Sequence, residues 1–503
     1  MQLPRLGTSE QFAALRGFLK DANYTETSIV ERLQLKSVRE LGDIIVRRGF
    51  EKYVAHSDPL NILIRLFLLG EYIPASEAES LPRAAWSVIG ALGLIADQST
   101  TSDRVASTVA LYPVGERYFI SDRWSNADHL PMATFPDIVY PAFTQSTQDF
   151  LVFLPEESCE DFLELCSGSG VAAIHAAGYV KRAWASDITH RSTEFALFNA
   201  ALNGTQNVTV LEGDLFSPLR GLTFDRIAAH PPYMPVLQPA EIYFAGGEDG
   251  EQITRRLVAE LPDYLRPGGR LYCRTLGTDR TAAPFEVRVR EWLGSSGPEF
   301  DIGLFITQNV EPYRFAVDSA LKKQRGSAEV EEWRALFSKL GVTDIVTGAL
   351  VIQRVAEPRR VFTVRRAFGA KKSREAVEWT LRWETAMAQD KGVAAFFQMK
   401  PRIGPRVELL VSHQQRNGEL RPQTFTLKTT HPFVLDCKVQ PWMCDLLTQA
   451  DGLVTVEQLF ADAKSKGWIH PQTPPEEFAR LLGVFVSGGF LVVDDARLPA
   501  AEE

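Results

Sequence analysis

The sequence predicts an α/β fold with a doubly wound, mostly parallel sheet, flanked by an N-terminal helical domain and a C-terminal α+β extension. Between about residues 159 and 355, short apolar segments alternate with segments of helical periodicity, as expected for strands joined by helical crossovers. Three apolar segments run directly into glycine-containing or acidic turns, at 166–170, 186–187 and 213–214. Because ligands of such sheets bind beyond the carboxyl ends of the strands, these turns predict one ligand pocket.

The predicted sheet consists of five apolar segments and a shorter tail. The candidate strands are FLELC, RAWASD, VTVLEGD, FDRIAAH and GRLYCRTL. Helix candidates begin near Gly170, Thr189 and Gly250. The tail adds FDIGLFITQ as a strand, EEWRALFSKLG as a helix and DIVTGALVIQRV as a strand. We expect this sheet domain to span residues 141–356.

The regions that flank the predicted sheet domain differ in their residue patterns. Residues 1–100 carry apolar residues at helical spacing and predict a helical domain, whereas 101–140 alternate and predict a β-rich connector that turns at 113–115. Residues 357–430 begin with a basic stretch at 359–374 and read as a mixed α/β extension. Residues 431–503 predict three helices and a closing apolar strand pair, FVSGGFLVV, in a winged-helix-like domain.

Length, net charge and apolar runs limit the number of domains, the classes of binding partner and the cellular compartment that we expect. At 503 residues the chain is long enough for two to four domains. Its formal net charge of -9 argues against a surface that binds nucleic acid all over. The start, MQLPRLGTSEQF, lacks the regions of a signal peptide, and the best apolar run, LNILIRLFLLG, is short and interrupted by Arg65. We therefore expect a cytoplasmic protein without a membrane span.

Cysteine and histidine spacing argues against a metal centre. The five cysteines form no CxxC pair and their number is odd, so free buried thiols are expected instead of a disulfide framework. The histidines show neither HExxH nor Cys/His ligand spacing. We predict no catalytic metal.

The turn SGSG at 167–170 suits close approach of a ligand to the backbone, because its glycines carry no side chain. A dinucleotide site would need a third glycine nearby, and the next one is Gly178. Glu164 can accept a hydrogen bond from an ammonium group. Asp187 can accept both hydroxyls of a ribose, or it can cap the helix near Thr189.

The third turn offers a place for a base. Asp214 can accept from the exocyclic amine of adenine with Leu215 against the ring. The alternative is that Asp214 is an ordinary turn residue.

Several motifs together resemble a known family. LELCSGSG, ASD, EGDLF and HPPYMP, followed by GGEDGEQITRRLV and LRPGGRLY, are similar to the S-adenosylmethionine methyltransferases of the release-factor glutamine N5-methyltransferase kind and their N6-adenine relatives, over roughly residues 140–280. The flanks look like those of a larger multidomain bacterial group. The resemblance implies a Rossmann-like sheet, S-adenosylmethionine as cofactor and methyl transfer as the reaction. It implies cofactor contacts at Glu164, Cys166, Gly168, Gly170, Asp187, Asp214 and Leu215, and catalytic contacts at His230, Pro231 and Tyr233.

The same resemblance draws attention to the segment 141–155. The relatives carry a loop and a helix there that cover the cofactor. Phe143 or Thr147 could close over the ligand, or both could simply pack a linker helix.

The predicted acceptor site departs from the family pattern at one residue. The relatives have Asn-Pro-Pro-Tyr, in which the Asn side chain and the following carbonyl accept the two N–H bonds of a planar nitrogen while the Tyr ring packs on it. This chain has His230 in place of Asn. The imidazole could act as an acceptor or a base with a pKa near 6.5, or position a different nucleophile, or mark lost catalysis.

Three functions remain open on the sequence. The first, which the acidic net charge favours over a nucleic-acid acceptor, is N-methyl transfer to a protein side chain or a small planar amine, with no membrane partner. The second is methylation of an RNA or DNA base, supported by Tyr233 and by Phe362 and Phe368 in the basic stretch. The third is a non-catalytic, cofactor-binding scaffold. The sequence leaves the methyl acceptor and the oligomeric state open.

Overall fold

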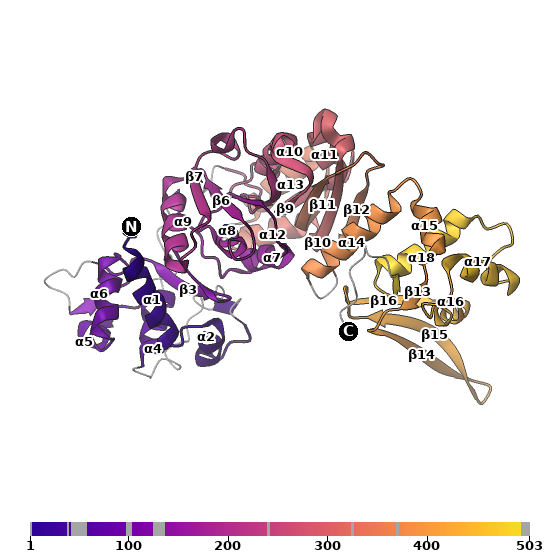
Figure 1. Ribbon diagram of the computed structural model, residues 1–503, viewed down its shortest axis with the longest axis horizontal. Helices are drawn as coiled ribbons and strands as arrows, with labels where there is room; N and C mark the ends of the chain where they lie inside the picture. Colours follow the sequence, from indigo (N-terminus) through magenta and orange to yellow (C-terminus); the bar gives the residue numbers. More distant parts are fainter. Residues whose placement is uncertain are drawn as a thin grey trace. The chain divides into compact units, whose positions relative to one another are not determined.

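The structure is a computed structural model that describes residues 3–37, 40–41, 58–96, 103–123, 136–238, 242–322, 326–368 and 372–493. The chain divides into two compact units (Figure 1). The first comprises Met1–Gly294 and Val310–Thr347, and the second comprises Ser295–Asn309 and Gly348–Glu503. The finer division into five segments stays a prediction.

The five predicted strands of the first unit all form, at the expected places. They are β5 (Asp161–Leu165), β6 (Arg182–Asp187), β7 (Val208–Glu212), β8 (Phe224–Ala229) and β9 (Leu265–Arg280). Each neighbouring pair among them is parallel. With β10 (Phe300–Val310), β11 (Val342–Arg354) and β12 (Thr363–Ala367), the sheet order is β12-β10-β11-β9-β8-β5-β6-β7. The α/β doubly wound fold is thus confirmed.

The strand order fixes where a ligand can bind. The chain runs from β5 outward through β6 to β7, then returns to the other side of β5 with β8 and β9. The carboxyl end of β5 therefore lies at the point where the strand order reverses, which is where open α/β sheets form a crevice.

Helices join these strands. They are α7 (Gln145–Phe153), α8 (Val171–Ala176), α9 (His190–Asn203), the 3₁₀ turn η4 (Ser217–Leu219), α10 (Gln252–Tyr264), α11 (Phe285–Trp292), α12 (Pro312–Lys322) and α13 (Ser327–Leu340). The Thr189 hydroxyl caps α9 by accepting the Ser192 N–H, and Gly204 ends the helix with φ 69°. The predicted helix starts near Gly170, Thr189 and Gly250 are confirmed.

The N-terminal part of the first unit is helical with a short β-hairpin, as predicted. Its elements are α1 (Ser9–Asp21), α2 (Glu26–Leu33), α4 (Pro59–Leu63), the π-helical turn η3 (Ile64–Leu68), β1 (Ile73–Pro74), α5 (Ala75–Ala78), α6 (Arg83–Ala91), β2 (Arg104–Val105), β3 (Ala110–Val114) and β4 (Arg117–Ser121). Residues 38–39 and 42–57 of the predicted helical domain lie outside the described residues. The rings of Phe12 in α1 and Phe198 in α9 meet edge to face at 5.0 Å, so this region shares a core with the sheet domain.

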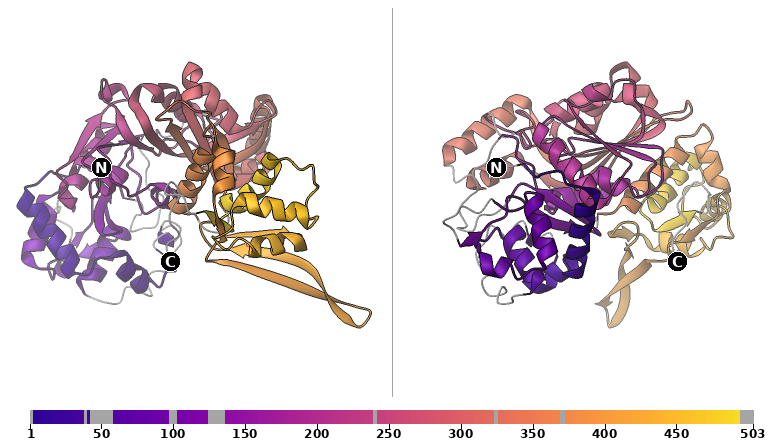
Figure 2. Two further views of the ribbon diagram at one scale, coloured as in Figure 1. Left: turned by 45° about the vertical axis from the view of Figure 1, so that its right-hand side comes forward. Right: turned by 60° about the vertical axis from the view of Figure 1, so that its left-hand side comes forward.

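In the second unit the 3₁₀ turn η5 (Gly294–Glu299) precedes β10. Beyond the sheet strands come α14 (Arg374–Met387), α15 (Gly392–Gln398), β13 (Pro401–Ile403), β14 (Val407–Arg416), β15 (Glu419–Thr429), β16 (Leu435–Val439), α16 (Pro441–Thr448), α17 (Val456–Ser465), α18 (Pro475–Ser487) and β17 (Leu491–Val493). Within this unit β14 and β15 form a long antiparallel hairpin (Figures 1 and 2).

One expectation for this unit is wrong. The three C-terminal helices form, but FVSGGFLVV is not a strand pair: its first residues continue α18, which ends before Gly488, and its last three form β17. The reason is periodic, because Leu482, Phe485 and Val486 extend the buried face of α18. Strand β17 pairs antiparallel with β13, at residues 401–403.

No helix built from the described residues is long and apolar enough to cross a membrane.

Candidate functional site

A cavity of about 720 Å³ opens in the first unit beyond the carboxyl ends of β5, β6 and β8. That volume is typical of a pocket for a small molecule or cofactor. All ten site residues predicted from the sequence contribute to this region, and nine of them line the cavity itself: Glu164, Cys166, Gly168, Asp187, Asp214, Leu215, His230, Pro231 and Tyr233.

The tenth, Gly170, acts one step behind the cavity wall. It stands in the left-handed region (φ 75°) just before α8, and an added Cβ would come within 3.1 Å of Ala196 Cβ in α9. Gly168 has φ 51°, and a Cβ there would meet nothing within 4 Å. The two glycines therefore differ: Gly170 lets α8 and α9 pack closely, whereas Gly168 leaves backbone open to the cavity.

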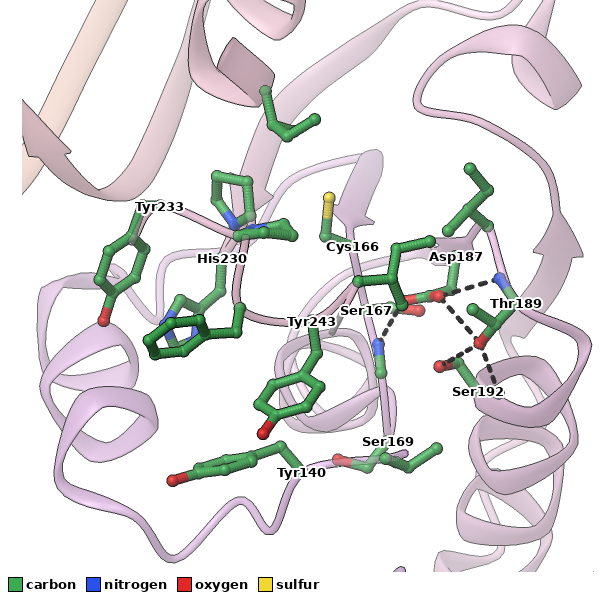
Figure 3. Close-up of a pocket in the computed structure, with 18 of the residues that line it drawn as sticks. Tyr140, Cys166, Ser167, Ser169, Asp187, Thr189, Ser192, His230, Tyr233 and Tyr243 are labelled. Carbon is green, nitrogen blue, oxygen red and sulfur yellow. Dashed lines mark hydrogen bonds between the residues drawn. The ribbon is translucent and has the colours of Figure 1, made fainter. Parts of the chain in front are cut away.

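Asp187 holds the glycine-containing turn in place. Its Oδ2 accepts the Gly168 N–H at 2.8 Å, and its Oδ1 accepts the Thr189 N–H at 3.1 Å (Figure 3). Burial raises the pKa of this carboxyl, while the bonds from Gly168 and Thr189 oppose the rise. The cap of α9 is Thr189, so the alternative of Asp187 as an N-cap is wrong.

Glu164 is the last residue but one of β5 and binds the first turn of α8. Its two carboxylate oxygens accept the backbone N–H groups of Ala172 at 3.1 Å and Ala173 at 2.8 Å. Burial nevertheless raises the pKa of Glu164 to about 8, because the two backbone bonds only partly offset the desolvation and Asp187 adds like-charge repulsion. The carboxyl can therefore exchange a proton near neutral pH.

The third turn provides an acid and an apolar side chain. Leu215 is buried and adopts φ 48°. Asp214 forms an ion pair with Arg256 of α10 at 2.7 Å, and both side chains are nearly half exposed. Arg256 lines the cavity as well, although no sequence motif singled it out.

His230 lies among aromatic rings. Its imidazole is nearly parallel to the Tyr233 ring (centroids 5.7 Å apart, 17° between planes) and tilted against Phe150 of α7 at 5.3 Å. Burial, with a smaller effect from Arg274, lowers the pKa of His230 to about 3. The pKa is thus well below the ordinary value near 6.5, so the ring stays neutral at neutral pH, which favours a hydrogen-bond acceptor over a general base.

A second pair of rings completes this side of the cavity. Tyr140 and Tyr243 stack with centroids 5.4 Å apart. In Figure 3 the rings of Tyr140, His230, Tyr233 and Tyr243 lie toward one side, and Asp187 lies toward the other. Neither Tyr140 nor Tyr243 was predicted from the sequence; the aromatic pair in EIYFAGG, shortly after HPPYMP, was the available signal for Tyr243.

The two candidate residues of the segment 141–155 have different surroundings: Phe143 precedes α7, and Thr147 lies in its first turn. Thr147 lines the cavity, which is compatible with its predicted place. Phe143 does not: it is 1% exposed and packs edge to face on Tyr112 of β3 at 4.9 Å. Phe143 thus belongs to the core shared with the hairpin and cannot close over a ligand without leaving that core.

Comparisons with known proteins agree with this geometry. Residues 142–275 match the model of the methyltransferase small domain. The chain is 38% identical over 127 residues to the ribosomal protein uL3 glutamine methyltransferase of Bradyrhizobium diazoefficiens, covering 23% of this chain and 40% of that protein. It is 35% identical over 142 residues to the release factor glutamine methyltransferase of Moorella thermoacetica, covering 25% of this chain and 50% of that protein.

A third relative is matched over more of its length. The release factor glutamine methyltransferase of Xylella fastidiosa is 30% identical over 201 residues, which cover 37% of this chain and 70% of that protein. The chain spans half or less of the first two relatives. Sheet order, glycine turn, acidic strand ends and these matches together place the chain among the class I S-adenosylmethionine-dependent methyltransferases of the glutamine N5-methyltransferase group.

Proposed function

We propose that this protein transfers a methyl group from S-adenosylmethionine to a planar nitrogen of a protein side chain or a small molecule. The observation that carries the proposal is that the HPPY segment at 230–233 and residues 166–169 of the cofactor turn line one cavity. The relatives that methylate glutamine in release factors and uL3 favour a protein acceptor.

The cofactor would occupy the side of the cavity formed by the first three strand ends. Gly168 offers open backbone, Asp187 a carboxylate for the ribose, and Asp214 with Leu215 a place for adenine. Glu164 would meet the positively charged methionine end. When bound, S-adenosylmethionine supplies a methyl group activated by its sulfonium.

The acceptor nitrogen would lie against the aromatic side. A planar amide or aromatic amine is a poor nucleophile because its lone pair is delocalised, so orientation and polarisation of its N–H bonds must supply the rate. The Pro231 carbonyl can accept one N–H bond and the neutral His230 ring the other. Because its pKa is near 3, the His230 ring stays neutral and can orient the nitrogen by accepting an N–H bond. As the new N–C bond forms, the bond between the methyl carbon and sulfur would break, the cofactor would leave as a neutral thioether, and the proton released from the nitrogen would pass to solvent.

Transfer of labelled methyl tests the proposal. The purified protein, labelled S-adenosylmethionine and an extract of cells lacking this protein are incubated, then divided between protease and nuclease. We expect the label to be lost to protease, or to run with small molecules, and to withstand nuclease. Label destroyed only by nuclease would replace this proposal with a nucleic-acid methyltransferase, and no label above that of a His230→Ala protein would favour a non-catalytic scaffold.

The basic stretch gives the nucleic-acid alternative less support than its charge suggests. Arg359 is only 7% exposed and pairs with the fully buried Asp301 of β10. Its guanidinium also lies 5.8 Å from the Phe362 ring centroid, and Phe368 is buried. These residues therefore stabilise the second unit and are not presented as a surface for a phosphate backbone.

Cofactor affinity should depend on pH through Glu164. Because the folded pKa is about 8, most of this carboxyl is protonated at pH 7, and a cationic ligand must displace the proton. We expect affinity to rise with pH up to about pH 8, by at most about tenfold per pH unit, and Glu164→Gln to remove this part of the dependence. Calorimetry of both proteins between about pH 6 and 8.5 measures the difference, and parallel profiles would contradict the assignment.

The same shift affects stability. The folded state holds the Glu164 proton more tightly than the unfolded chain, so this group favours folding at low pH. That contribution declines as pH rises from the ordinary Glu value through about 8.

A further inference from the structure

A buried carboxylate, that of Glu251, directly precedes α10 and follows the segment 242–250. Glu251 is fully buried and does not line the cavity. Its Oε1 accepts the N–H and the hydroxyl of Thr278, each at 2.7 Å. Arg288 of α11 donates hydrogen bonds to both oxygens, with Nη1 2.6 Å from Oε2 and Nη2 2.7 Å from Oε1. Such a two-pronged contact fixes direction as well as distance.

A second carboxylate, that of Asp249, belongs to the same network of charges as Glu251 and Arg288. Asp249 accepts the Glu251 N–H at 3.0 Å and forms ion pairs with Arg255 and Arg280, each at 2.8 Å. Arg280 also reaches Glu251 at 3.3 Å. The turn before α10 is thereby tied to β9 and α11, both regular elements of the first unit.

The segment 242–250 also forms backbone hydrogen bonds with the residues that directly follow the HPPY segment. Met234 N–H donates to the Phe244 carbonyl at 3.1 Å, Gly246 N–H to the Met234 carbonyl at 2.8 Å, and Val236 N–H to the Gly247 carbonyl at 3.0 Å. The approach is close enough to require glycine. A Cβ on Gly246 would lie 2.8 Å from Tyr233 Cα, and one on Gly250 would lie 2.5 Å from the Tyr233 carbonyl oxygen.

We infer that Glu251 and Arg288 are positioning residues for the acceptor side of the site. They hold the segment 242–250, which supplies Tyr243 to the cavity wall, at a fixed distance from the segment 230–236, which supplies His230 and Tyr233. This inference rests on the proposed function only in assigning the aromatic side to the acceptor.

Stability alone does not explain a charged pair here. Replacing a buried ion pair by apolar side chains of similar size is often neutral or stabilising, because desolvation offsets the attraction. What an apolar pair cannot supply is the direction set by five donors on one carboxylate, two from Thr278, two from Arg288 and one from Arg280. The arrangement is therefore suited to holding two loops in register.

Hydrogen exchange of the backbone amides tests the inference without any acceptor. In Glu251→Gln, the N–H groups of Met234, Val236 and Gly246 should exchange about tenfold faster or more, since a hydrogen-bonded charge that restrains them is gone. The amide of Gly168 should keep its protection, and affinity for S-adenosylmethionine should stay within about twofold.

Asp161→Asn is the matched control. Asp161 begins β5 at the opposite end of the strands, is 2% exposed, and accepts Arg182 through both oxygens at 2.6 and 2.8 Å. This variant removes an equally buried, doubly bound carboxylate, so it reports general destabilisation. Both variants are compared at the same interval below their own melting temperatures.

Two results would overturn the inference: exchange at Met234, Val236 and Gly246 that rises equally in both variants, or that does not rise in Glu251→Gln. If Glu251→Gln fails to fold, Arg288→Lys keeps the charge but loses the fork, and the same three amides should exchange faster, to a smaller extent. Because exchange needs no methyl acceptor, failure here is distinct from failure of the proposed function, which the labelled-methyl assay reports.

Discussion

Replacing Asp187 with alanine is expected to weaken S-adenosylmethionine binding by at least tenfold. The ribose would lose two charge-assisted hydrogen bonds, each worth about 1.5–3 kcal/mol. The turn would also lose its restraint, because Asp187 accepts the Gly168 N–H at 2.8 Å. Titration calorimetry with S-adenosylmethionine measures the loss directly, and thermal unfolding reports whether the variant folds.

Glu212→Gln is the control for this measurement. Glu212 is the register partner of Asp187 on the neighbouring strand β7, its side chain is half exposed, and it pairs with His190 at 3.0 Å. It does not line the cavity, so affinity should change little. Equal losses in the two variants would mean that charge at this edge of the sheet, and not the Asp187 carboxylate, attracts the cofactor.

Prediction from the sequence succeeded where a motif is contiguous and its environment is implied by the motif itself. The glycine turn and the acids at strand ends follow one another along the chain, and parallel strands bring their carboxyl ends to one edge whatever the details of packing. For this reason nine predicted residues line a single cavity.

It failed where the answer depends on distant segments. Tyr140 and Tyr243 stack across about a hundred residues of sequence, and nothing local indicates their pairing. The place of Phe143 is decided by Tyr112 in the hairpin. Strand β17 finds its partner at 401–403, whereas the sequence suggested a neighbour within the same apolar run. The pKa of His230 depends on burial, which its own motif does not reveal.

Replacing His230 with alanine is expected to lower turnover by about a hundredfold, the size of effect seen when an oriented polar group of an active site is removed. Affinity for S-adenosylmethionine should change little, since the ring lies with Phe150 and Tyr233 and away from Asp187 (Figure 3). This split is typical of a group used mainly in the transition state. Single-turnover methyl transfer and calorimetry on the same preparation measure both quantities.

The variant His230→Asn tests whether methyl transfer requires the imidazole ring or only a planar hydrogen-bond acceptor at this position. It restores the residue of the related Asn-Pro-Pro-Tyr segment, so activity equal to or above that of the natural protein would mean that any planar acceptor at this position suffices. Activity near that of His230→Ala would mean that the acceptor requires the imidazole. His175→Asn is the matched control, because His175 stacks on Phe119 at 5.8 Å and lies outside the cavity lining.

The pH dependence of the methyl-transfer rate distinguishes two roles of His230, orientation of the acceptor nitrogen and removal of its proton. With its pKa lowered to about 3, the His230 ring stays neutral from about pH 5 to 8, so transfer should show no loss of rate near pH 6.5 that disappears in His230→Asn. A base of ordinary pKa would produce such an acid limb in the natural protein alone. Finding it would require that the ring be reached by water in the working enzyme, and it would return His230 to the role of a general base.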